Sequence, residues 1–222
     1  NKIRLKAPII LPAMAKLNWQ DYYSGAAMAG VMVVIGENAV KLDPDLAHDV
    51  NGKISNAPII GKMVDCFRKF DKGYGDIVLQ VNADDIVLGS AEYALKNFDV
   101  RTIEIKFGQA AKGIQHVAPV NSPEEAEYLK KNGYLVFENP NGSGLIQCGR
   151  LPMWNEATLR EVICRYRSCG AKNILFKMAG YDINDIRRVI QIASANNVDL
   201  ITFDGAGGGT GNSPTKMMNE WG

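Results

Sequence analysis

Short apolar runs separated by polar turns repeat along the chain. The runs are rich in Val, Ile and Leu and read as continuous apolar segments, which is typical of strands buried on both faces. Six of them are predicted to be strands, at residues 8–12, 31–35, 76–81, 100–106, 173–177 and 199–203. Strands of this kind separated by helices indicate a parallel sheet with helices packed outside it.

Helical periodicity fills most of the segments between these runs. Asn18 can cap a first helix, and Pro58 is a favourable first residue for a second. Asp182 is expected to cap a later helix. Its inner face is expected to carry Ile183, Ile186, Val189, Ile190 and Ala193. Residues 107–154 are less regular, and we interpret them as an insertion with a helix after residue 122 and a short strand at 134–137.

The position of the polar residues helps to choose between a closed (β/α) barrel and an open doubly wound sheet. Polar groups follow nearly every predicted strand, among them Glu37, Gln80, Lys106, Lys177 and Asp204. In a barrel the chemistry gathers at the C-terminal ends of many strands around one mouth. We therefore predict one domain over residues 1–222, a (β/α)8 TIM barrel incomplete at its C-terminus. With six of eight strands present, the chain is expected to be part of a longer one.

Composition excludes several classes of protein. The 222 residues are 46% hydrophobic and 22% charged, which is average for a globular chain. Lys plus Arg total 25 against 24 for Asp plus Glu, so there is no net positive field to hold nucleic acid or an acidic membrane surface. Neither a membrane span nor a signal peptide is found in the pattern, and a cytoplasmic protein is expected. The four Cys include no C-x-x-C pair and there are two His, so neither a metal site nor an iron-sulfur cluster is expected.

Two lysines end apolar strands, as I-E-I-K at Lys106 and I-L-F-K at Lys177. A cation held near low-dielectric walls needs an anionic partner or a shifted pKa, which favours an anion or an electron-rich cofactor above them. The alternative is that each stem covers apolar surface while its ammonium group reaches water.

A glycine-rich segment follows the last predicted strand. It contains Gly205, Gly207, Gly208, Gly209 and Thr210. Glycines let backbone N–H groups approach a ligand closely, so this segment is a candidate anion-binding loop, with a flexible loop as the alternative. The loop after Lys106 adds an amide and another cation at Gln109 and Lys112.

Both loops resemble motifs of one known family. E-I-K-F-G-Q-A-A-K at residues 104–112 resembles the E-I-K-x-x-Q-G-A-K segment of the flavin-binding synthase domain of glutamate synthase. D-G-A-G-G-G-T-G-N-S-P at residues 204–214 is similar to that family's S-G-H-D-G-G-T-G-A-S-P. Weaker similarity covers the A-M turn before Ala15, the G-E at residues 36–37 and the Q-V at residues 80–81. The resemblance implies a (β/α)8 barrel that carries FMN at its mouth.

The resemblance also implies roles for individual residues on the cofactor side. Lys177 matches a lysine beside the flavin pyrimidine edge, where a cation stabilises the charge of the reduced ring. Gln80 matches an amide that reads the other polar edge, and Met14 and Ala15 would place backbone against the ring. Glu37 and the glycine segment complete the expected cofactor contacts.

On the substrate side, Lys106, Gln109 and Lys112 match positions that bind the carboxylates of 2-oxoglutarate in glutamate synthase, and Lys106 is also expected to contact the cofactor. Asp204 stands where the family has serine, and Ala206 replaces its histidine. The reacting groups therefore differ, and Lys177, Lys106 and Asp204 are the candidate catalytic residues.

These observations predict an FMN-dependent oxidoreductase that reduces an imine formed from a 2-oxo acid, with a 2-oxo acid or an amino acid as its small-molecule partner. A homo-oligomer is left open. One alternative is a redox-neutral flavin-dependent isomerase, because type 2 isopentenyl diphosphate isomerase also resembles the G-A-G-G stretch. The other is a degenerate barrel that serves as a non-catalytic subunit.

Overall fold

The computed structural model describes residues 3–107, 117–131, 134–150, 156–180 and 182–204. Its main feature is a six-stranded parallel sheet in the order β1-β2-β5-β6-β10-β11. These strands are β1 Ile10–Met14, β2 Met32–Ile35, β5 Asp76–Val81, β6 Thr102–Lys106, β10 Asn173–Ala179 and β11 Leu200–Asp204. The strands follow one another in space in their chain order. Right-handed crossovers between them therefore place the connecting helices on one face of the sheet.

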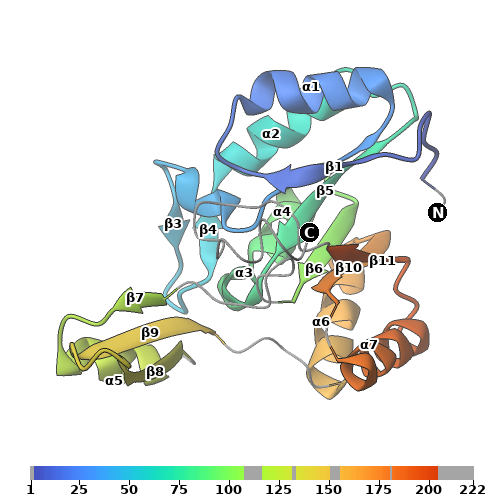
Figure 1. Ribbon diagram of the computed structural model, residues 1–222. Helices are drawn as coiled ribbons and strands as arrows, with labels where there is room; N and C mark the ends of the chain where they lie inside the picture. The colour runs from blue at the N-terminus through green and yellow to red at the C-terminus, as the bar shows by residue number, and fades with distance from the viewer. Residues whose placement is uncertain (1–2, 108–116, 132–133, 151–155, 181, 205–222) are drawn as a thin grey trace.

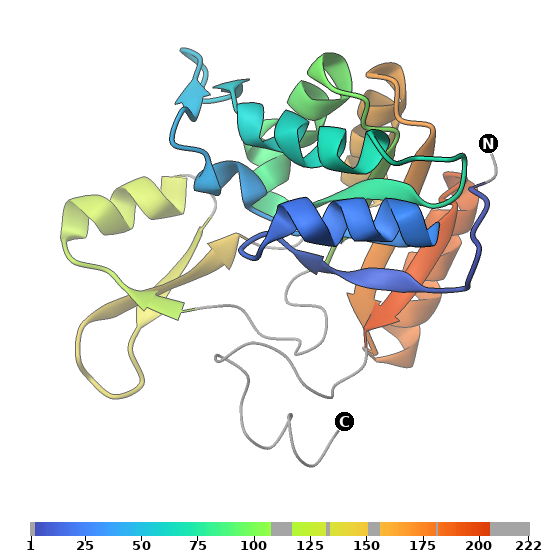
Figure 2. The same cartoon turned by 90° about the horizontal axis from the view of Figure 1, so that it is seen from above.

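The helices cover the outer face of the curled sheet (Figures 1 and 2). They are α1 Trp19–Ala29, α2 Pro58–Arg68, α3 Ala83–Leu88, α4 Ser90–Asn97, α6 Glu156–Ser168 and α7 Ile183–Ala195. A short 3-10 helix, η1 Ala39–Leu42, follows β2, and β3 Ala47–His48 and β4 Ile54–Asn56 form a two-stranded antiparallel sheet. The main core lies between these helices and the sheet, and includes the edge-to-face pair Phe107 and Phe176.

The prediction of a (β/α)8 barrel is wrong. In the part of the chain that the structure describes, the six parallel strands form a curled half-barrel with two edges, at β1 and β11. Barrel closure requires hydrogen bonds between the first and last strands, at a tilt and stagger that depend on the number of strands. The pairings found here end at β1 on one side and β11 on the other. The six strands predicted from the apolar runs are present, but their order along the chain did not show whether the sheet closes.

Residues 117–150 are more regular than the sequence predicted. They contain β7 Val117–Pro119, α5 Pro123–Lys131, β8 Tyr134–Glu138 and β9 Leu145–Arg150. The three strands form an antiparallel sheet in the order β7-β9-β8, which projects beside the main sheet with α5 against it (Figure 1). The loop between β8 and β9 closes by hydrogen bonds between Asn139 and Gly144 and between Gly142 and Asn139, and both glycines have positive φ. Residues 139–144, which are rich in Asn and Gly, therefore form the turn of a β-hairpin.

The inner face predicted for α7 is wrong at two positions. Val189 and Ala193 are buried as expected, together with Ile192, but Ile183 is 64% exposed and Ile190 is 44% exposed. Because α7 precedes the edge strand β11, only one of its flanks has a neighbouring helix among the described residues. A stripe of aliphatic residues at helical spacing is therefore only partly covered.

Candidate functional site

The candidate site lies on the inner face of the half-barrel, toward the C-terminal ends of its strands. Ile103 and Ile105 of β6 pack into the core beneath the helices. Because side chains alternate along a strand, Glu104 and Lys106 face the opposite, concave side. The same alternation in β10 brings Lys177 to that side, since Phe176 and Met178 belong to the helix-facing core.

Lys106 and Lys177 are in-register partners on the adjacent strands β6 and β10. The ammonium group of Lys106 binds Glu37 Oε1 at 3.1 Å, and that of Lys177 binds Asp204 Oδ2 at 3.0 Å. The lysine side chains are only 13% and 17% exposed. The ammonium groups therefore bind carboxylates at a sheltered site, which distinguishes them from lysines that extend freely into water.

Gln80 and Glu104 lie one layer deeper. They are in-register partners on β5 and β6, and Gln80 Nε2 donates a hydrogen bond of 2.6 Å to Glu104 Oε1. Both side chains are buried. Burial raises the pKa of the Glu104 carboxyl above its usual range, against the hydrogen bond from Gln80 and the charges of Lys177 and Lys106, which lower it; the charge of Asp204 adds to the rise.

Glu104 is the site residue that sequence reasoning missed. A signal for it was present, because the period-two pattern of E-I-K puts Glu104 on the same face as Lys106. The motif that carries the resemblance starts at this residue, and it implies roles for Lys106, Gln109 and Lys112 but none for Glu104.

A buried carboxylate supports the segment that carries Glu37. Asp85 Oδ2 accepts hydrogen bonds from the backbone N–H groups of Asn38, at 2.9 Å, and Asn82, while Ser90 Oγ donates to Oδ1. Asn82 and Asp85 form a capping box at the start of α3. Burial is the main cause that raises the pKa of Asp85, and the three hydrogen bonds oppose it. Asp85 thus ties the β5–α3 turn to the β2–η1 turn that places Glu37 beside Lys106.

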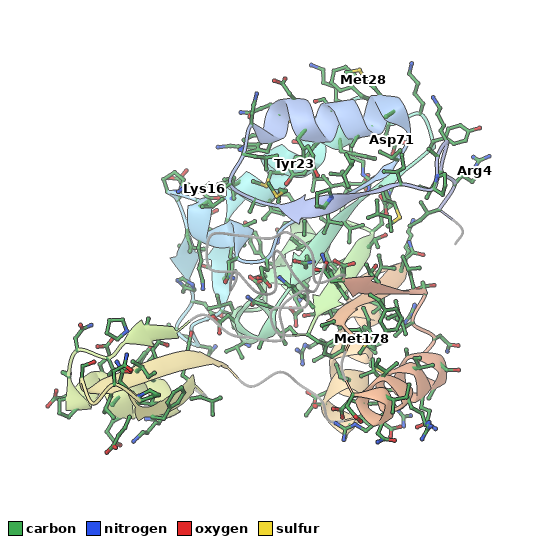
Figure 3. The ribbon with its side chains drawn as sticks, in the orientation of Figure 1. Arg4, Lys16, Tyr23, Met28, Asp71 and Met178 are labelled. Carbon is green, nitrogen blue, oxygen red and sulfur yellow. The ribbon has the colours of Figure 1, made fainter. Side chains whose placement is uncertain are left out.

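The end of β1 forms one wall near the site. The carbonyl of Met14 accepts hydrogen bonds from Gly36 N and from the hydroxyl of Tyr23, which lies between α1 and β1 (Figure 3). A Cβ at Gly36 would lie 3.1 Å from Ala15 N, closer than side chains normally pack. Glycine therefore allows the ends of β1 and β2 to approach. The Met14 carbonyl already has two donors, so it is a poor candidate for a further ligand contact.

Apolar side chains continue the concave face away from the charged groups. Met32, Val34, Val78 and Leu175 form a buried cluster there. Leu175 pairs with Glu104 in the sheet, so this apolar layer adjoins the polar one. The concave face thus joins an apolar floor to a rim of two cations and three carboxyl groups.

Several predicted site residues lie outside the described residues. These are Gln109 and Lys112 on the substrate side and Gly205, Gly207, Gly208, Gly209 and Thr210 on the cofactor side. Of the predicted residues that the structure describes, Glu37, Gln80, Lys106, Lys177 and Asp204 are brought together, with Met14 and Ala15 at the end of the neighbouring strand β1.

Comparison with models of known protein families found no match, and a search of curated proteins found no similar sequence. Among the described helices, none is both long and apolar enough to cross a membrane. The same residues include no group of three or more His, Cys, Asp or Glu side chains arranged to hold a metal ion.

Proposed function

We propose that this chain is an FMN-dependent oxidoreductase related to the flavin domain of glutamate synthase, acting on a small 2-oxo acid or the corresponding amine. The observation that carries the proposal is the pairing of Lys106 with Lys177 across β6 and β10. Residues 71 positions apart, each chosen for its match to the family, lie next to one another on one face. The sequence resemblance supplies the identity of the cofactor.

The residues present fit a flat heteroaromatic cofactor with a polar edge. Lys177 offers an ammonium group and Gln80 offers an amide, and both adjoin the buried apolar cluster of the concave face. Such a site is sheltered from water, so a cation there stabilises negative charge on a bound ring more than an exposed lysine does. Bound FMN would supply hydride transfer, the chemistry that no side chain of the site provides.

The two ion pairs indicate how the chain handles anionic ligands. Each lysine is neutralised by an acid, which lowers the cost of holding it in a sheltered place. A carboxylate of the substrate can take the place of Glu37 beside Lys106, and the site then keeps its balance of charge. Asp204 of β11 holds Lys177 toward the concave face by an ion pair. Serine, which the family has at this position, carries no charge and could not form that ion pair.

The proposal is tested by expressing the full chain with ample riboflavin, purifying it, and measuring the flavin released on denaturation. We expect FMN at close to one per chain. A folded protein that neither retains FMN nor binds it on titration would contradict the proposal.

A further inference from the structure

One hydrogen bond joins the two buried polar side chains beneath the lysines. Gln80 is 1% exposed and Glu104 is 3% exposed, and Gln80 Nε2 donates to Glu104 Oε1 at 2.6 Å. Among the described residues, neither side chain makes a second hydrogen bond. The orientation of the Gln80 amide is therefore set by Glu104.

The direction of this hydrogen bond follows from the chemistry of the two groups. An ionised carboxylate only accepts hydrogen bonds, so it selects the NH2 end of the amide. The carbonyl oxygen of Gln80 is then left for another partner. A protonated carboxyl group can donate to that carbonyl instead, and the NH2 end is then the one that remains.

We propose that Glu104 is a positioning residue that sets the direction of the Gln80 amide and thereby decides whether the site offers its ligand an acceptor or a donor. The inference rests on the proposed function for the identity of the ligand. FMN carries an imide N–H between its two ring carbonyl groups, so a site whose Gln80 presents a carbonyl is matched to that N–H. With Glu104 protonated, the site loses this match.

The charged groups around Glu104 determine which state is populated. Lys106 on β6 and Lys177 on β10 favour the ionised form, whereas Asp204 on β11 and burial favour the neutral one. Glu37, which binds Lys106 from the β2–η1 turn, is the remaining acid of the cluster. Because burial is the largest of these effects, the changeover occurs above the usual range of a glutamate pKa. The acceptor form therefore predominates above this raised pKa and declines as pH falls through it.

The first test uses the purified protein without flavin. The side-chain amide of Gln80 is followed by 1H–15N NMR between pH 4.5 and 8.5, and is assigned by its loss in Gln80→Met. We expect its shifts to follow a single titration that disappears in Glu104→Gln, while the amide of Gln147, in the separate three-stranded sheet, does not follow it. A Gln80 amide that is insensitive to pH, or that titrates equally in Glu104→Gln, would overturn the inference.

The second test compares FMN with 3-methyl-FMN, in which a methyl group replaces the imide hydrogen. We expect the protein at pH 8 to prefer FMN by roughly three- to tenfold, the worth of one hydrogen bond. The preference should shrink as pH falls through the pKa of Glu104 and lose its pH dependence in Glu104→Gln. Equal affinity for the two flavins at every pH would overturn the inference. If neither flavin binds, the proposed function fails, and the amide titration alone decides the role of Glu104.

Discussion

Lys106 and Lys177 occupy paired positions on adjacent parallel strands, and their ammonium groups bind carboxylates on opposite sides, Glu37 toward β2 and Asp204 on β11. Two like charges on neighbouring strands repel each other, and the two acids compensate this repulsion. The arrangement keeps two cations at the C-terminal end of the sheet without a net charge. It also gives each lysine a distinct role that can be tested separately.

Replacing Lys177 with Met is predicted to lower the reduction potential of bound FMN by about 30–60 mV, because a charge-assisted interaction with the reduced ring is lost. Spectroelectrochemical titration of the reconstituted protein measures the shift. Lys172→Met removes the same charge just before the start of β10, at the opposite end of the strand from Lys177. This control is expected to leave the reduction potential within roughly a few millivolts of the wild-type value. A Lys177→Met protein that retains FMN at an unchanged potential would remove Lys177 from this role.

Replacing Lys106 with Met is predicted to weaken binding of a dicarboxylate more than binding of FMN. With 2-oxoglutarate as the probe, we expect the Kd to rise about tenfold, and that of FMN by less than about threefold. Isothermal titration calorimetry measures the first value and fluorescence quenching the second. Equal losses for both ligands would point to a structural role for Lys106 instead.

The strands of the main sheet could be predicted because their signal is local. The runs at residues 31–35 and 76–81 are rich in β-branched residues and are buried throughout β2 and β5. Closure of the sheet has no such signal, since it depends on whether β1 and β11 meet. Motifs that resemble those of a barrel family, at residues 104–112 and 204–214, do not supply the missing contacts between the two edges of the sheet.

The candidate site shows the same division between local and distant information. Alternation in E-I-K could have revealed Glu104, because it requires only the period of a strand. The hydrogen bond from Asn38 N to Asp85 joins positions 47 residues apart and leaves no pattern in the sequence. Likewise, the exposure of Ile183 and Ile190 depends on which neighbours α7 has, and helical periodicity cannot supply that information.

Replacing Asp85 with Ala is predicted to reduce the free energy of unfolding by about 2–4 kcal/mol, since the capping box of α3 is lost and buried donors at Asn38 and Ser90 lose their acceptor. Urea denaturation at pH 7 measures the change. Ser90→Ala removes one of these hydrogen bonds and should cost about 1 kcal/mol. Asp84→Ala is the matched control: its carboxylate forms a 3.6 Å ion pair with the half-exposed Lys41, and it should cost less than about 1 kcal/mol. Equal losses for Asp84→Ala and Asp85→Ala would contradict the special role of the buried carboxylate.

Replacing Glu104 with Gln is predicted to change how stability depends on pH. The pKa of Glu104 is raised in the folded protein, so the folded state holds this proton more tightly than the unfolded state does. The resulting stabilisation is fully present below the unfolded pKa of glutamate and is lost as pH rises through the higher folded value. Glutamine resembles the protonated side chain and cannot ionise. The stability of Glu104→Gln minus that of wild type should therefore be larger at pH 8 than at pH 4.5. The urea midpoints of the two proteins at each pH measure this difference. Glu124→Gln, on the exposed first turn of α5, lacks a raised pKa and serves as the control, for which no such relative gain at alkaline pH is expected. A stability difference between Glu104→Gln and wild type that is constant over this range, or that shifts in favour of wild type as pH rises, would show that burial does not dominate the ionisation of Glu104.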